Sequence, residues 1–253
     1  MSSGTAARIE NEKSFHDARF TEEVRDAQGK YYASIKHGSS HYGNRVAELA
    51  KGKDILEYGC GGISQGDTLA SLARTLTGID ISTVAVEKAN AAAANRGLSN
   101  VHYLEMNAEE MTFPDGSFDL VFGRGIIHHL DLKKSFESIR RVLRPGGTAL
   151  FWEPLGHNPV LNRYRQMTPE ARTPDEHPLL KSDFTLAERY FDVERLDFYG
   201  LTTLLSVPLR DTGPGDAVLS VTSAIDRVLF RSPMRWLAWY VLIELKKPAE
   251  EEG

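Results

Sequence analysis

The sequence predicts an α/β fold built on a doubly wound, mostly parallel sheet. From about residue 50 onward, short apolar strands alternate with helical stretches of roughly 10–15 residues, a pattern typical of parallel β-α-β units. A glycine-rich turn, Gly59-Cys-Gly-Gly62, follows the first strand, and Asp80 ends the second. Because such sheets bind ligands at the carboxyl ends of their strands, these residues also predict where the site lies.

The expected elements follow in order along the chain. Strands are expected at 54–58, 76–81, 101–106, 118–122 and 148–152, and helices at about 65–75, 83–96 and 132–143. Ser82 is placed to cap the second of these helices at its start, and Gly97 is placed to cap it at its end. Pro145-Gly-Gly147 is expected to stop the third helix.

The two ends of the chain and two insertions are expected to surround this sheet. Residues 1–50 are polar with scattered aromatic residues and predict an N-terminal helical segment. The main domain is expected to span 51–247, with further strands at 193–198 and 240–245 and cap insertions at about 156–185 and 200–235. Residues 248–253 are acidic and are expected to fray.

Composition restricts the class of protein. The chain has 253 residues, 41% of them hydrophobic, and a formal net charge of −5. No apolar run approaches the roughly 20 residues of a membrane span, and the N-terminus lacks the apolar region of a signal peptide, so a cytoplasmic location is expected. The single cysteine, Cys60, excludes an internal disulfide and a cysteine metal cluster. The acidic balance favours small or uncharged partners over nucleic acid and leaves a homo-oligomer open.

The glycine turn does not match two well-known phosphate-binding patterns. In the dinucleotide fingerprint G-x-G-x-x-G the third glycine would fall at Ser64, and no G-K-[ST] follows as in a P-loop. This weakens the interpretation as an NAD-binding sheet without eliminating it.

Four ordered motifs together resemble the class I S-adenosylmethionine-dependent methyltransferases. They are Ile55-Leu-Glu-Tyr-Gly-Cys-Gly-Gly62, Gly78-Ile-Asp-Ile-Ser82, the run from Asn107 to Phe122, and Leu143-Arg-Pro-Gly-Gly147. The resemblance covers about residues 50–155. It implies a Rossmann-like sheet of seven strands whose last strand is antiparallel, and S-adenosylmethionine as the cofactor.

The resemblance also implies roles for residues at the first two strands. Gly59 and Gly61 would pass close to the methionine part of the cofactor, with Glu57 beneath them. Asp80 would accept hydrogen bonds from both ribose hydroxyls.

Further roles follow at the next two strands. Ile81 would pack against the adenine face, the Ala108 backbone amide would meet the ring, and Asn107 would accept from the exocyclic amine. Gly123 and Arg124 would lie near the amino and carboxylate ends of the cofactor.

Candidate catalytic residues follow the fourth and fifth strands. Methyl transfer is an in-line displacement that needs alignment and exclusion of water, and a base when the acceptor arrives protonated; no metal is required. His128 and His129 are candidates for that base, His128 being preferred. Glu153 and His157 form a second candidate group; for each histidine, packing or a structural loop is the alternative.

Tyr32 completes the expected site, in a segment that folds over the cofactor in related enzymes. Core packing is the alternative for this side chain. The expected function is transfer of a methyl group to a small molecule such as a natural product, a lipid or a quinone-like compound, with the acceptor atom (O, N, S or C) left open. An NAD-dependent oxidoreductase and a non-catalytic cofactor-binding module remain alternatives.

Overall fold

A seven-stranded sheet, with strand order β3-β2-β1-β4-β5-β7-β6, forms the centre of the molecule. The computed structural model describes residues 3–21, 31–61, 65–168, 173 and 176–249. The strands are β1 (Asp54–Tyr58), β2 (Thr75–Asp80), β3 (Val101–Glu105), β4 (Phe118–Arg124), β5 (Leu143–Pro154), β6 (Asp192–Tyr199) and β7 (Tyr240–Lys246). Neighbouring strands from β3 to β5 are parallel, while β7 is antiparallel to both β5 and β6. The predicted fold class, including the antiparallel last strand, is confirmed.

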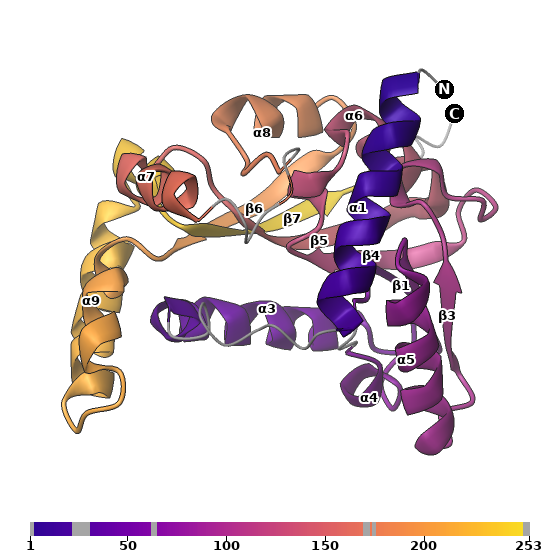
Figure 1. The fold of residues 1–253 in the computed structure, drawn as a ribbon, viewed down its shortest axis with the longest axis horizontal. Helices are drawn as coiled ribbons and strands as arrows, with labels where there is room; N and C mark the ends of the chain where they lie inside the picture. The colour runs from indigo at the N-terminus through magenta and orange to yellow at the C-terminus, as the bar shows by residue number, and fades with distance from the viewer. Residues whose placement is uncertain (1–2, 22–30, 62–64, 169–172, 174–175, 250–253) are drawn as a thin grey trace.

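Helices cover both faces of the sheet (Figure 1). They are α1 (Ser3–Thr21), α3 (Lys36–Leu49), α4 (Gly66–Leu69), α5 (Thr83–Asn95), α6 (Leu132–Val142), α7 (Pro159–Met167), α8 (Lys181–Ala187) and α9 (Gly215–Leu229). Short 3-10 helices are η1 (Ala33–Ile35), η2 (Ala108–Glu110), η3 (Ile127–His129), η5 (Thr202–Leu209) and η6 (Pro233–Leu237). None of the helices in the described parts of the chain combines the length and the apolar composition needed to cross a bilayer.

Two apolar cores lie on opposite faces of the sheet. The first joins the strands to α6 and α8 and includes Phe136, Ile139 and Phe184. The second joins them to α3, α4 and α5. Gly38 of α3 shows how closely the second core is packed, because a Cβ there would lie 2.4 Å from the ring of the fully buried Trp152 and 2.6 Å from Tyr199. These layers fix the orientation of the strand ends that form the site.

Two predicted details of the first half differ from the structure. The helix expected at about 65–75 is limited to α4, because the Arg74 amide donates to the Lys53 carbonyl and Thr75 already belongs to β2. The expected turn at Pro145-Gly-Gly147 lies within β5, which begins directly after α6. Gly146 keeps the positive φ of a turn there, at 71°. The pairing of β5 with β4 shifts register between Leu143 and Thr148, so the predicted turn persists as an irregularity inside the strand.

Other predictions for the elements are confirmed. The Ser82 side chain accepts from the Ala85 amide and caps α5, and Gly97 follows that helix with a φ of 66°.

The region 200–235, which the sequence left unassigned, contains η5 and α9, held together by Asp226. Its carboxylate accepts from the backbone amides of Leu201 and Thr202. The terminal residues 250–253 of the expected frayed tail lie outside the described residues.

Candidate active site

The site lies where β1 and β4 end, at the point where the strand order reverses. Strands β2 and β3 continue the sheet on one side of this point and β5 continues it on the other. Helices leave the ends of adjacent strands in opposite directions there, which opens a crevice at the carboxyl edge of a doubly wound sheet. The predicted site residues from Glu57 to Arg124 come from the ends of these strands and the loops that follow them.

The glycine turn after β1 is held against the end of β2. Gly59 and Gly61 have φ values of 76° and 57°, a left-handed backbone conformation that glycine adopts without steric cost. The backbone amides of Gly59 and Cys60 both donate to the Ile79 carbonyl, at 2.9 Å each. The Gly61 amide donates to Oδ2 of Asp80, also at 2.9 Å. Residues 62–64 lie outside the described residues, so the rest of this turn is not placed.

Asp80 fits the predicted contact with a ribose. Its side chain is partly exposed at the carboxyl end of β2, and Oδ1 accepts from the Ser82 amide at 2.9 Å. An ionised carboxylate has about four acceptor positions, so the two backbone bonds leave capacity for a pair of hydroxyls. The same two bonds fix the orientation of the carboxylate before any ligand arrives.

Glu57 is buried beneath the turn. It is 5% exposed, and its Oε1 accepts from the Gln65 amide at 3.0 Å, on the far side of the turn from Asp80. Tyr42 of α3 lies nearby; burial first, and then the negative charge of Glu57, raises the pKa of its phenol well above the usual value. Glu57 therefore holds the backbone at Gln65, and its role beneath the glycines stays a prediction.

The predicted adenine contacts lie under α1. Asn107 caps η2, with its Oδ1 accepting from the Glu109 amide at 3.0 Å, and Ala108 is buried. From α1, the Lys13 ammonium donates to the Ile81 carbonyl at 3.1 Å and to the Thr83 hydroxyl at 2.7 Å. The sequence pattern did not identify Lys13, since a lone lysine on a polar helix carries no signal before the fold is known.

Gly123 and Arg124 differ in what surrounds them. A Cβ at Gly123 would lie 2.7 Å from the Tyr58 carbonyl and 2.7 Å from Ile126, so packing between β4 and β1 already requires glycine there. Arg124 is exposed and donates to the Ser39 hydroxyl of α3 at 2.6 Å. The guanidinium thus contacts α3 at the end of β4.

Tyr32 belongs to an aromatic cluster beside Arg124. Its ring stacks on Trp239 with centroids 5.5 Å apart, and it meets Tyr240 edge-on at 6.3 Å. Tyr240 in turn stacks on Trp152 at 5.1 Å. With 39% of its surface exposed, Tyr32 forms the outer layer of this cluster. The ring is therefore available to a ligand on one face and packed on the other.

His128 and Glu153 form a buried pair at the ends of β4 and β5. The distance from His128 Nδ1 to Glu153 Oε2 is 2.6 Å, and the two residues are 6% and 0% exposed. Glu153 Oε1 also accepts from the backbone amides of Ile126 and Ile127, at 2.9 and 3.2 Å. A carboxylate acceptor at Nδ1 places the proton there and leaves Nε2 of His128 as a hydrogen-bond acceptor. The sequence placed Glu153 in a separate group with His157, whereas the fold joins it to His128.

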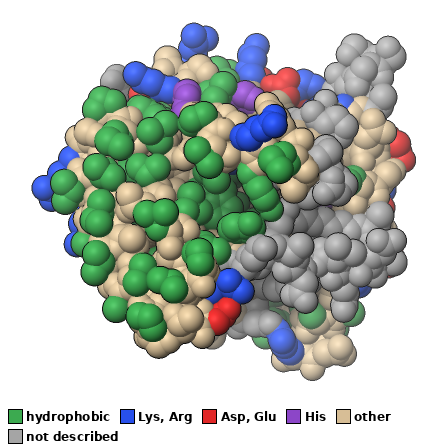
Figure 2. Space-filling model, turned by 60° about the vertical axis from the view of Figure 1, so that its left-hand side comes forward, with side chains coloured by type: hydrophobic (Ala, Val, Ile, Leu, Met, Phe, Trp, Pro, Cys, Tyr) green, Lys and Arg blue, Asp and Glu red, His purple; other side chains and the backbone are tan. Residues whose placement is uncertain are grey.

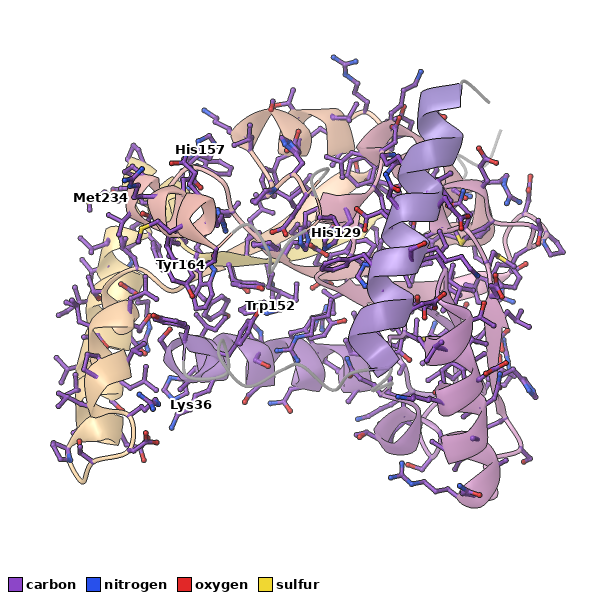
Figure 3. All side chains as sticks on the ribbon, viewed as in Figure 1. Lys36, His129, Trp152, His157, Tyr164 and Met234 are labelled. Carbon is purple, nitrogen blue, oxygen red and sulfur yellow. The ribbon has the colours of Figure 1, made fainter. Side chains whose placement is uncertain are left out.

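The other two candidate histidines have different surroundings. The His129 ring lies 4.1 Å from that of His128, and its Nδ1 lies 3.3 Å from the Thr173 hydroxyl. His157 accepts from the Lys181 amide at 2.9 Å, which ties it to the start of α8. Figure 3 shows His157 beside α7, well separated from His129. Both histidines stay predicted candidates. Of the two, only His129 lies beside the His128–Glu153 pair.

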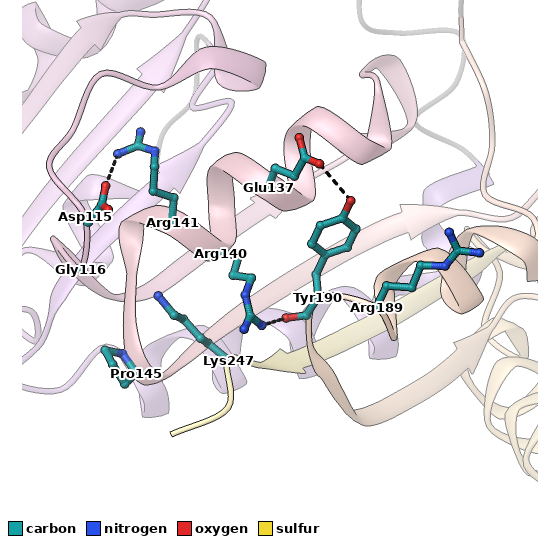
Figure 4. A pocket seen from close by; sticks show the side chains of 9 residues that line it. All are labelled: Asp115, Gly116, Glu137, Arg140, Arg141, Pro145, Arg189, Tyr190 and Lys247. Atoms are coloured by element: carbon teal, nitrogen blue, oxygen red, sulfur yellow. Dashed lines mark hydrogen bonds and ion pairs between the residues drawn. The ribbon is translucent and has the colours of Figure 1, made fainter. Parts of the chain in front are cut away.

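A hollow lies away from these strand ends, at the opposite edge of the sheet (Figure 4). It has a volume of about 750 Å³ and is lined by Asp115, Gly116, Glu137, Arg140, Arg141, Pro145, Arg189, Tyr190 and Lys247. Two of its three arginines are engaged by neighbours, since Arg141 pairs with Asp115 at 2.9 Å and Arg140 donates to the Tyr190 carbonyl. The volume of a hollow therefore does not identify the site. The polar groups that converge at the strand ends identify it.

Comparison with known sequences agrees with this location. Residues 56–151 match the family model described as a methyltransferase domain. The chain is 31% identical over 138 residues to sterol 24-C-methyltransferase ERG6A of Gibberella zeae, covering 53% of this chain and 35% of the relative. It is 35% identical over 136 residues to a probable chloroplastic tocopherol O-methyltransferase of Oryza sativa subsp. japonica, covering 52% and 35%. The chain thus spans little more than a third of these relatives.

Solved structures share the fold. Geranyl diphosphate C-methyltransferase from Streptomyces coelicolor superposes with a TM-score of 0.66 at 12% identity, covering 95% of this chain and 97% of that one. The N-methyltransferase NodS from Bradyrhizobium japonicum gives 0.63 at 12% identity, covering 94% and 99%. The solved structures therefore show that this chain has the fold of these methyltransferases, and within that fold residues 56–151 match the methyltransferase-domain model.

Proposed function

We propose that this chain transfers a methyl group from S-adenosylmethionine to an apolar small molecule, with His128 as the general base. The observation that carries the proposal is the buried His128–Glu153 pair at the carboxyl edge of the sheet, next to the strand ends that form the cofactor site. The acceptor belongs to the same broad class as those named for the relatives.

The cofactor residues support this function by their chemistry. The Asp80 carboxylate is oriented by two backbone amides, as a hydrogen-bond acceptor for a diol must be. The bound cofactor supplies a methyl group made electrophilic by its sulfonium. Glu57 and the Lys13 contact on the Ile81 carbonyl hold the turn and α1 around the position where it would bind. The protein thereby aligns the reactants and excludes water, which are the main requirements of such a displacement.

The geometry of His128 supports its role in moving a proton. Glu153 fixes the ring through Nδ1, and Nε2 then accepts the proton of the acceptor's hydroxyl, phenol or ammonium group. The resulting imidazolium is stabilised by the carboxylate 2.6 Å away. Because Glu153 is fully buried and also bound by two backbone amides, it acts as a positioning residue that cannot swing away.

An apolar acceptor is supported by the surface of the caps. Large apolar side chains are exposed on α7, η5, α9 and η6. They are Val160, Met167, Leu205, Leu209, Val221, Ile225, Val228 and Met234, with exposed fractions from 38% to 75%. Figure 2 shows apolar side chains gathering around a hollow on this face. Exposed apolar patches mark ligand-binding grooves or interaction sites, and an apolar acceptor fits such a groove.

Cofactor choice is tested by calorimetric titration of the purified chain with S-adenosylhomocysteine and, separately, with NADH. We expect saturable binding of S-adenosylhomocysteine and none of NADH. Tight binding of NADH alone would refute the methyltransferase function and favour the oxidoreductase alternative.

The base is tested with a panel of sterol, tocopherol, quinol and prenyl diphosphate acceptors and a cofactor carrying a labelled methyl group. With any acceptor that is methylated, we expect His128→Ala to reduce kcat by about 10²–10⁴-fold, the usual contribution of a positioned base. Glu153→Gln should lower kcat with S-adenosylhomocysteine affinity unchanged. His102→Ala, which removes an exposed imidazole on β3, is the matched control. An unchanged rate in His128→Ala would exclude the base role, and a bound cofactor with no methylated product across the panel would favour a non-catalytic module.

A further inference from the structure

Glu12 of α1 is a buried carboxylate whose surroundings do not satisfy it. The residue is 6% exposed, and neither Oε1 nor Oε2 has a hydrogen-bond partner among the described residues. Removing a carboxylate from water without compensating hydrogen bonds is costly, so such groups in proteins are paired with a cation or bound to a metal. A positively charged group at this position would compensate the buried negative charge of Glu12.

Two imidazole nitrogens lie beside this carboxylate. His16 Nε2 is 3.4 Å from Glu12 Oε2, and His129 Nδ1 is 3.8 Å from the same oxygen. Glu12 and His16 are four residues apart on α1 and therefore share one face of the helix. His129 comes from η3, on the other side of the gap between α1 and the end of β4. The three ligand atoms lie within 4.8 Å of one another.

These separations are close to those of a coordinated ion. Metal–ligand distances of roughly 2.0–2.2 Å in tetrahedral or octahedral geometry place neighbouring ligand atoms about 3.0–3.4 Å apart. The two distances to Glu12 Oε2, 3.4 and 3.8 Å, would need to contract by at most about 0.8 Å, and the separation of the two nitrogens, which lies within 4.8 Å, would need to contract by up to about 1.8 Å. His129 Nδ1 also lies 3.3 Å from the Thr173 hydroxyl, a contact that the ion would replace.

The charged neighbours leave the face of Glu12 open to a cation. Arg8 of the same helix is directed to the Glu109 carboxylate and the His129 carbonyl, and Lys13 to Glu105 on β3. Glu109 also accepts from the Asp131 amide, which keeps it on the η2 side of α1.

We infer that Glu12, His16 and His129 bind one divalent transition-metal ion. Two imidazoles and one carboxylate suit Zn²⁺, Co²⁺, Ni²⁺ or Fe²⁺ and not Mg²⁺ or Ca²⁺, which prefer oxygen ligands. The ion joins α1 to η3, so it fastens the N-terminal helix over the strand ends and beside the His128 ring. The inference stands apart from the methyl-transfer proposal, since binding can be measured without cofactor or acceptor.

A neighbouring set of residues provides a competing location. His128, His129 and Glu176 also bring three ligand atoms together, with His128 Nε2 3.9 Å from Glu176 Oε1. Glu12 is favoured because both of its buried carboxylate oxygens lack a hydrogen bond among the described residues, which is not the case for Glu176.

The test is a Co²⁺ titration of the full chain, free of affinity tag and dialysed against chelator, followed by equilibrium dialysis and by the visible absorption of bound Co²⁺. We expect one ion per chain. Glu12→Gln, which preserves size but removes the charge, and His16→Ala should each weaken binding by at least about 10-fold, the lower end of what is lost when even a supporting partner is removed. His102→Ala should bind as the wild type does, and circular dichroism verifies folding of each variant.

Three outcomes would overturn the inference. The first is the absence of stoichiometric binding by a folded wild-type chain. The second is equal binding by the wild type, Glu12→Gln and His16→Ala. The third is loss of binding in Glu176→Gln with retention in Glu12→Gln, which would move the ion to the competing set.

Discussion

Replacing Asp80 with alanine offers a direct test of the cofactor site. The carboxylate accepts from the amides of Gly61 and Ser82, at 2.9 Å each, and keeps capacity for the ribose hydroxyls. Hydrogen bonds to a charged group contribute about 1.5–3 kcal/mol, and each 1.4 kcal/mol is a factor of ten in affinity. The variant should therefore bind S-adenosylhomocysteine about 10- to 150-fold more weakly.

The effect on folding should be smaller than the effect on binding. Asp80 is partly exposed, so water can replace the carboxylate at the two amides that it leaves. Isothermal titration calorimetry gives the affinity and urea unfolding gives the stability. Asp192→Ala, at the exposed start of β6, is the matched control and should change neither. Wild-type affinity in Asp80→Ala would refute the assignment, as would an equal loss in the control.

Three further predictions concern packing, pH and reactivity. Gly38→Ala should lower the free energy of unfolding by about 1–3 kcal/mol because the new Cβ would come within 2.6 Å of two aromatic rings. Gly43→Ala in the same helix meets nothing within 4 Å and should raise the free energy of unfolding by about 0.5–1 kcal/mol. Urea unfolding measures both changes. Hydrogen bonds from Arg74 above all lower the pKa of Asp54 in the folded chain. The stability that this pair contributes is therefore complete above the unfolded pKa of about 4 and is lost as acid protonates the carboxylate. In Asp54→Asn the free energy of unfolding should fall less steeply between pH 5 and 3. Burial raises the pKa of the Cys60 thiol, so iodoacetamide at pH 8 should label it far more slowly in the native chain than in urea, and equal rates would contradict its burial.

The sequence by itself determined the order of the elements and the strand ends that carry ligand-binding residues. Alternation of short apolar strands with helices has few solutions other than a parallel sheet, so Gly59 and Asp80 had to meet at one edge of it. The sequence also predicted both ends of α5, the Ser82 cap and the stop at Gly97, because a cap depends on a few neighbouring residues.

Only the tertiary structure decided which side chains act together. Glu153 and His128 lie 25 residues apart and on different strand ends, so no local pattern joins them, yet the pairing of β4 with β5 places them 2.6 Å apart. Likewise the sequence gives no reason for Glu12 and His16 of a polar helix to meet His129; packing of α1 across the strand ends creates that contact. Local propensity and periodicity act over a few residues, whereas a site of this kind is assembled by long-range packing, and its members become visible only when the sheet has been ordered.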